Sequence, residues 1–169
     1  MRVPPRTAAP YVPPKADVGA LRAAAAVCKG CDLHERGTQT VFGQGEAGAA
    51  LLFVGEQPGD QEDLAGRPFV GPAGQLLDEA LARAGVARGA AYVTNAVKHF
   101  KWEPRGPRRL HKAPSAGEIA AWRPWLEAEV RAIQPRAVVC LGVTAARSVL
   151  ARTVRLGDVR GGPHDSPLG

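Results

Sequence analysis

Three short apolar runs, each the length of one buried strand, most constrain what this chain can fold into. They are Leu51–Val54, Ala91–Asn95 and Ala137–Leu141. Apolar residues at helical spacing lie between them, over 73–84 and from 115 to 133. Strands that alternate with helices predict a parallel sheet with helices on both of its faces. The sequence therefore predicts an α/β fold.

Composition and capping residues mark the predicted helices. Residues 17–27 are rich in alanine, and Leu21 adds to an apolar face. Ser115 and Glu118, three residues apart, form a capping box that places a helix start there. A last helix is expected over residues 144–151.

Two long segments follow the first and second predicted strands without a regular period. Residues 55–72 contain four glycines and three prolines, and residues 99–114 are rich in arginine and lysine. Both are expected to be loops, and a long loop inside a compact domain is usually functional. Ligands of parallel sheets bind beyond the carboxyl ends of the strands, so both loops and Asn95 should converge on one site.

Length and charge indicate one domain with a polyanionic partner. The 169 residues suffice for a real core, with residues 1–16 expected as a disordered Pro-rich leader and residues 17–169 as the domain. The formal net charge of +6 favours nucleic acid, because basic side chains that neutralise phosphates release condensed counterions. No apolar run reaches the ~20 residues of a membrane span, so no membrane partner is expected.

Cysteine usage indicates a reducing compartment. The chain has three cysteines, an odd number, and two of them form the pair Cys28-Lys29-Gly30-Cys31. This pattern suits a reduced interior better than a disulfide scaffold, so we expect a cytoplasmic protein.

Four side chains near the predicted strand ends suit recognition of a planar base. Glu56 supplies an acid/base group, Gln57 an amide, and Phe69 a ring that can stack. The Asn95 amide can both donate and accept, as the Watson–Crick edge of a pyrimidine such as uracil requires. Plain alternatives stay open. The segment with Glu56 and Gln57 can be an ordinary loop with a solvated carboxylate, Phe69 can hold its loop against the core, and Asn95 can be a turn residue.

Four sequence blocks together resemble the uracil-DNA glycosylases, and specifically their iron–sulfur branch. The blocks are 55–59 (GEQPG), 66–74 (GRPFVGPAG), 92–98 (YVTNAVK) and 141–146 (LGVTAA). The resemblance extends in order from residue 20 to about residue 160. It implies a three-layer αβα sandwich with a short parallel sheet, and excision of uracil from DNA.

Within that branch the chain looks like the UdgX type. The similarity lies in Glu56-Gln57, in 98–102 (KHFKW) and in 106–112 (GPRRLHK). In that type the histidine of the last loop, here His111, becomes covalently bonded to the abasic sugar once uracil has left. The product is a protein–DNA adduct in place of free abasic DNA.

The resemblance also implies the roles of individual residues. The catalytic residues would be Glu56, His111 and Gln57. The uracil contacts would be Gln57, Phe69 and Asn95. The contacts to DNA phosphates would be Arg108, Arg109 and Lys112. The expected partner is uracil-containing DNA, single-stranded or with its uracil flipped from a duplex, and the expected state is a monomer.

The implied cofactor is an iron–sulfur cluster of the 4Fe-4S kind. Its ligands would be Cys28, Cys31, His99 and a fourth residue at the position of Trp122, where relatives carry cysteine. An indole cannot ligate iron, so one expected ligand is replaced. Zinc on Cys28 and Cys31 is an alternative, although only two ligands lie close together in the sequence.

The carboxyl-terminal part departs from the family. Relatives continue with another strand and a His-Pro-Ser-type motif, whereas residues 161–169 are rich in glycine and proline, and His164 is not assigned the role of that motif's histidine. We therefore expect the fold to lack its last strand. Three functions stay open: covalent capture through His111, ordinary hydrolytic excision with water activated near Glu56, and a catalytically impaired DNA-binding remnant.

Overall fold

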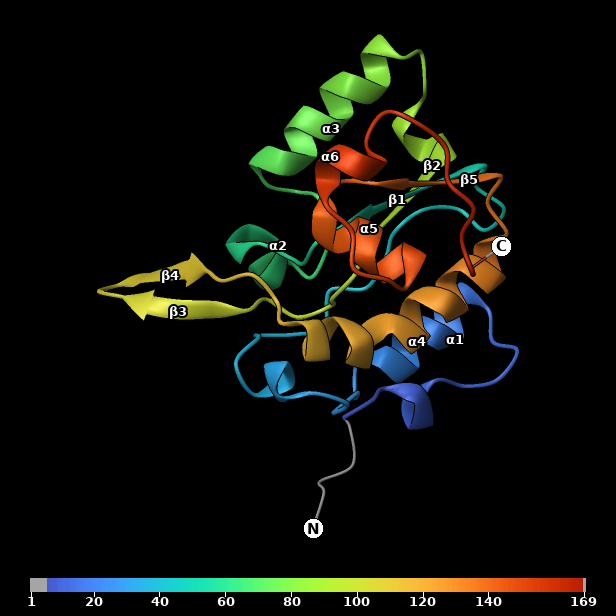
Figure 1. Cartoon of the computed structure of the whole chain (residues 1–169). Helices are drawn as coiled ribbons and strands as arrows, with labels where there is room; N and C mark the ends of the chain where they lie inside the picture. Colours follow the sequence, from blue (N-terminus) through green and yellow to red (C-terminus); the bar gives the residue numbers. More distant parts are fainter. Residues whose placement is uncertain (1–5, 169) are drawn as a thin grey trace.

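A three-stranded parallel sheet confirms the predicted α/β fold in the computed structural model, which describes residues 6–168. The strands are β1 (Leu51–Gly55), β2 (Ala91–Asn95) and β5 (Ala137–Cys140), in the order β2-β1-β5. Leu51 lies opposite both Ala91 and Ala137. All three carboxyl ends therefore meet at one edge of the sheet (Figure 1).

The predicted helices are present and begin close to the predicted residues. Asp17 accepts a hydrogen bond from the Ala20 N–H at 2.8 Å, and the Ser115–Glu118 capping box is formed. The α-helices of the described residues are α1 (Val18–Ala25), α2 (Asp60–Ala65), α3 (Pro72–Arg83), α4 (Ala116–Ile133), α5 (Val143–Leu150) and α6 (Leu156–Val159). Short 3-10 turns cover Ala9–Tyr11, Asp32–Glu35 and Arg88–Ala90.

Alternating strand residues bury the two faces of the sheet under different helices. Leu52 and Val54 of β1 pack with apolar residues of α4 and α5, whereas Phe53 packs with Leu77 and Leu81 of α3. The sheet thus lies between two helical layers, and α1 packs on the outer side of α4 (Figure 1). Successive side chains of a strand point to opposite faces of the sheet, so helices on both faces bury both sets of side chains.

Two segments that were expected to be loops contain regular structure. Residues 55–72 include α2, whose start is stabilised by the Glu62 carboxylate accepting from the Gly59 N–H at 3.1 Å. Residues 99–114 include an antiparallel hairpin of β3 (Trp102–Arg105) and β4 (Arg108–His111), which projects from the body of the molecule (Figure 1). The loop prediction is wrong at both places, because glycine and proline obscured the periodicity of short elements.

The amino-terminal segment differs from the disordered leader that was expected, as far as it is described. Ala8 is buried, and its N–H donates to the Ala121 carbonyl of α4 at 2.9 Å. Residues 1–5 of the expected leader lie outside the described residues. Within the described part of the chain, no helix combines the length and the apolar character needed to cross a membrane.

Candidate active site

The chain segments that leave β1 and β2 continue side by side at the carboxyl edge of the sheet. The Ala96 N–H donates to the Gly55 carbonyl at 2.9 Å, and the Val97 N–H donates to the Glu56 carbonyl at 3.1 Å. The backbone of Glu56 is therefore fixed relative to Asn95, the last residue of β2. Sequence reasoning predicted this convergence from the strand ends alone.

Glu56 lies between His111 and Thr144. The His111 Nε2 is 3.1 Å from the Glu56 Oε1, and the Thr144 hydroxyl donates to the Glu56 Oε2 at 2.5 Å. His111 is the last residue of β4, Glu56 directly follows β1, and Thr144 lies at the start of α5. The side chains of His111 and Glu56 are 50% and 31% exposed, so the pair lies at the surface of the molecule.

Phe69 and Asn95 come together over Gly55. A Cβ added at Gly55 would collide with the Asn95 Oδ1 and would lie 2.8 Å from the Phe69 Cζ. Asn95 is buried and Phe69 is half-buried, so a ring face and an amide both border the backbone that precedes Glu56. Only glycine leaves this close approach open.

The loop that carries Phe69 is held in an unusual shape. Phe69 has a φ of +56°, in the left-handed region that side chains rarely adopt, and its carbonyl lies against Gly74. The Glu62 carboxylate bridges two loops, accepting from the Gly59 N–H and from the Gly71 N–H at 2.6 Å. Such local strain persists only where surrounding contacts fix it, and it often marks a functional site.

A fully buried ion pair lies beneath Asn95. The Lys98 Nζ donates to the Glu129 Oε2 at 2.5 Å, to the Asn95 carbonyl at 2.7 Å and to the Thr94 hydroxyl at 2.7 Å. The Tyr92 hydroxyl also donates to Glu129, and burial raises the pKa of this phenol well above its usual range. Lys98 thus ties the strand end that carries Asn95 to α4.

Gln57 uses its side chain to hold the hairpin. Its amide nitrogen donates to the carbonyls of Lys101 and Lys112, at 3.1 and 3.2 Å, and its amide oxygen accepts from the Lys101 N–H. These two residues flank the hairpin, so Gln57 links the end of β1 to the base of the element that carries His111. The side-chain amide of Gln57 is therefore engaged on both its nitrogen and its oxygen.

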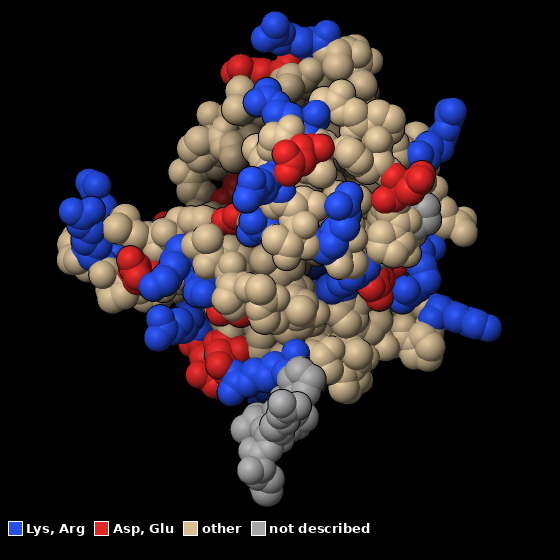
Figure 2. Space-filling view, in the orientation of Figure 1, with Lys and Arg blue, Asp and Glu red and all other residues tan. Residues whose placement is uncertain are grey.

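The three basic residues predicted to bind phosphates lie in different environments. Arg108 is exposed at the hairpin tip, where Figure 2 shows basic side chains gathered. Lys112 forms an exposed ion pair with Glu103 at 2.9 Å. Arg109 instead packs back onto the body of the molecule, with ion pairs of 2.6 Å to both Asp60 and Asp63.

Arg109 therefore anchors the hairpin. Asp63 is fully buried, and the guanidinium lies 5.3 Å from the centroid of the Phe100 ring and 5.7 Å from that of Trp102. Both of its charged partners belong to α2, which directly follows the segment that contains Glu56. This contact fixes β4, and hence His111, relative to the Glu56 carboxylate.

The predicted cluster ligands are buried together with two tryptophans. The indole N–H groups of Trp122 and Trp125 donate to the sulfurs of Cys31 and Cys28, at 3.1 and 3.3 Å. The Trp122 ring also packs edge-on against His99, with 5.1 Å between ring centroids. Among residues 6–168 no three histidine, cysteine or acidic side chains come close enough together to hold a metal ion.

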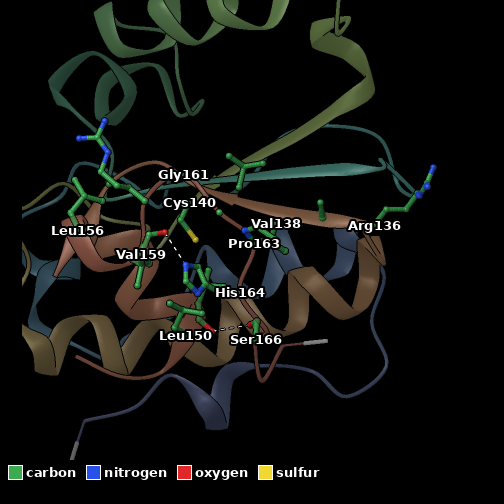
Figure 3. Close-up of a pocket in the computed structure, with 17 residues that line it drawn as sticks. Arg136, Val138, Cys140, Leu150, Leu156, Val159, Gly161, Pro163, His164 and Ser166 are labelled. Atoms are coloured by element: carbon green, nitrogen blue, oxygen red, sulfur yellow. Dashed lines mark hydrogen bonds between the residues drawn. The ribbon is translucent and has the colours of Figure 1, made fainter. Parts of the chain in front are cut away.

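A cavity of about 540 Å³ lies elsewhere, beside β5 (Figure 3). It is bordered by Val138 and Cys140 of the strand, by α5 and by the carboxyl-terminal segment. His164 lines this cavity and its Nε2 is 3.0 Å from the Val159 carbonyl. None of the residues predicted to act on DNA lines it.

Comparison with known proteins identifies the family of this chain. The family model described as the uracil DNA glycosylase superfamily matches residues 42–168. The chain belongs to the uracil-DNA glycosylase superfamily. A Type-4 uracil-DNA glycosylase of Pyrobaculum aerophilum is 41% identical over 138 residues, which cover 79% of this chain and 67% of that relative. Another, from Thermotoga maritima, is 40% identical over 139 residues, covering 82% of this chain and 69% of the relative.

Sequence reasoning missed two residues that shape the site of this superfamily member, Thr144, which acts on Glu56, and Glu62, which holds the Phe69 loop. Arg109 was named for a phosphate contact, and its ion pairs with α2 were not foreseen. Thr144 lies at the start of α5, within the 141–146 block that carries part of the family resemblance. Its place in that block was the signal that could have identified it. Nothing in the local sequence indicates the contacts of Arg109.

Proposed function

We propose that this chain excises uracil from DNA and that His111 then bonds to the abasic sugar. The observation that carries the proposal is the contact of 3.1 Å between the His111 Nε2 and the Glu56 Oε1. It sets an imidazole beside a carboxylate at the carboxyl edge of a parallel sheet, where ligands of such sheets bind. The relatives named Type-4 uracil-DNA glycosylase support uracil as the base.

The pocket for the base is formed by Phe69, Asn95 and the backbone at Gly55. A flipped uracil stacks on the Phe69 ring while the Asn95 amide accepts from N3–H and donates to O4. Extruding the base costs a few kcal/mol of lost stacking, which these contacts must offset. The buried position of Asn95 strengthens its hydrogen bonds, because water does not compete for the amide.

The capture step requires a neutral imidazole at the sugar carbon. The glycosidic bond breaks, the electron pair leaves with uracil, and C1′ becomes electron-poor. A lone pair of the His111 ring forms a new C–N bond to C1′, and the proton that the ring must lose passes to Glu56. The hydrogen bond from Thr144 orients the carboxylate for this transfer. A C–N bond to imidazole has a poor leaving group, so the adduct persists.

Basic side chains of the hairpin hold the flanking phosphates. Arg108 at the tip and the nearby Arg105 are exposed, and Lys112 is engaged only by an exposed carboxylate that DNA can displace. Contacts of this kind position DNA without sequence preference and weaken as salt rises. Arg109 is assigned to the hairpin anchor in this proposal and not to DNA.

A second candidate is ordinary hydrolysis. The side chains of Glu56 and His111 are 31% and 50% exposed, so water can reach the carboxylate. In this alternative Glu56 activates water, and the enzyme releases free abasic DNA with turnover.

The experiment incubates the protein with a single-stranded oligonucleotide that contains one uracil. Capture predicts a shifted band that survives SDS, at most one uracil released per chain, and loss of the band in His111→Ala. His164→Ala is the matched control, because this exposed histidine lies at the separate cavity. A thymine oligonucleotide controls for the base. Repeated uracil release without a band, unchanged in His111→Ala, would establish hydrolysis. DNA binding with no release would refute both.

A further inference from the structure

The site that the resemblance assigns to an iron–sulfur cluster is filled by side chains. Cys28, Cys31 and His99 are each at most 5% exposed. The two cysteines belong to one buried, mainly apolar cluster with Trp122 and Trp125, and His99 packs against Trp122. Trp122 is 1% exposed, and Trp125 is fully buried. The indole rings of Trp122 and Trp125 therefore lie against the two sulfur atoms that a metal cluster would need as ligands.

Both cysteine sulfurs are already engaged. Trp122 and Trp125 stand three residues apart on one face of α4, so their N–H groups reach Cys31 and Cys28 together, at 3.1 and 3.3 Å. An indole N–H only donates, and it cannot bind a metal. To ligate iron, each cysteine thiolate would have to lose its hydrogen bond from an indole. The fourth ligand would still be missing, because Trp122 stands at its position.

Trp122 separates His99 from the cysteines. Its ring packs against the imidazole at 5.1 Å between centroids while its nitrogen contacts the Cys31 sulfur. The His99 Nε2 is 3.2 Å from the Thr40 hydroxyl, and its Nδ1 has no hydrogen-bond partner among the described residues. That nitrogen is available as one ligand, but within residues 6–168 it belongs to no group of three histidine, cysteine or acidic side chains that could hold a metal ion.

The remaining contacts close the cysteine loop around the protein's own core. A Cβ at Gly30 would lie 2.7 Å from the Ala8 Cα, and the Ala8 N–H donates to Ala121, the neighbour of Trp122. The loop between the cysteines, the amino-terminal segment and α4 are therefore packed directly on one another. Hydrogen bonds and apolar contacts hold the cysteine loop against α4, as metal–ligand bonds would in a cluster-bound domain.

We infer that Trp122 takes the place of the iron–sulfur cluster, so that this chain folds without iron. The residues present do not fit a four-iron cluster, since three candidate ligands are separated by the side chain that stands at the fourth position. The indole contacts supply a metal-free link between α4 and the cysteine loop. The inference concerns the fold and is independent of whether His111 captures DNA.

The test is metal content measured on the full chain, expressed with added iron and purified without oxygen. We expect far less than one iron and one acid-labile sulfide per chain, no zinc, and no visible thiolate–iron absorption, both as purified and after incubation with iron and sulfide. The thermal unfolding midpoint should not change when a strong chelator is added. About four irons with matching sulfide, stoichiometric zinc, or unfolding by the chelator would overturn the inference.

Two substitutions identify Trp122 as the cause. Trp122→Cys restores a fourth ligand and should gain iron, sulfide and visible absorption in the same incubation. Trp122→Phe keeps a buried ring without its N–H, and it should stay folded and free of iron. A folded Trp122→Cys chain that binds no iron, or a Trp122→Phe chain that assembles a cluster, would show that the indole is not what excludes the metal. Uracil release is measured on the same proteins, so that a failure of the metal inference can be told apart from a failure of the proposed function.

Discussion

The imidazole of His111 and the carboxylate of Glu56 lie 3.1 Å apart, although one ends a projecting strand and the other follows the central strand of the sheet. Two contacts outside the pair maintain this distance. Gln57 bonds to both flanks of the hairpin, and Arg109 joins β4 to the carboxylates of α2. The site is thus formed by the docking of a hairpin onto the edge of a sheet.

Thr144 is expected to act through Glu56. Thr144→Val removes the hydroxyl that donates at 2.5 Å but keeps the shape of the side chain. A hydrogen bond to a charged group contributes ~1.5–3 kcal/mol, so adduct formation should slow by roughly tenfold or more. Single-turnover gels over time measure the rate. Thr144→Ser should restore it, and a Val variant with the unaltered rate would remove Thr144 from the mechanism.

Arg109 and Arg108 should respond differently to substitution. Arg109→Ala leaves the buried Asp63 carboxylate without its cation and frees the hairpin, so adduct yield should fall strongly. Arg108→Ala removes an exposed cation, so DNA affinity should weaken and the salt slope should fall by roughly 1. Fluorescence anisotropy over a salt series, with gel assays at saturating DNA, separates the two effects. Equal losses of affinity in both variants would contradict the anchoring role of Arg109.

Gly55 should tolerate no side chain. Gly55→Ala places a methyl group against the Asn95 Oδ1 and the Phe69 Cζ, where overpacking costs ~1–3 kcal/mol. Uracil release should be nearly abolished, because the added atom displaces both groups that border the base pocket. Gly89→Ala is the control, since a Cβ there meets nothing within 4 Å. Gly55→Ala with ordinary uracil release would show that the base binds elsewhere.

The Lys98–Glu129 pair should matter more for stability than any exposed ion pair. Glu129→Gln keeps the volume but leaves the fully buried Lys98 uncompensated, which should lower the free energy of unfolding by ~3–5 kcal/mol. Asp78→Asn breaks the exposed pair with Arg88 and should cost no more than ~1 kcal/mol. Urea unfolding followed by circular dichroism compares them. Similar midpoints for both variants would show that the buried pair has little net effect.

Local sequence was sufficient for the main elements of the fold. The apolar runs at 51–54, 91–95 and 137–141 became the three strands of the sheet, and the Ser115–Glu118 capping box marked the start of α4. These features depend on periodicity and on contacts within one turn of helix, which neighbouring residues decide. The convergence of Glu56 and Asn95 followed from a general property of parallel sheets.

Only the tertiary structure decided what the polar and aromatic side chains do. Gln57 was expected at the base, and its side chain hydrogen-bonds to the hairpin. Arg109 was expected on phosphate, and it forms ion pairs with α2. Trp122 was expected to leave a ligand missing, and its indole N–H donates to the Cys31 sulfur. Each outcome depends on a partner far away in the chain. The energy of a hydrogen bond or ion pair is set by which groups are buried together, and that is not encoded in the spacing of neighbouring residues.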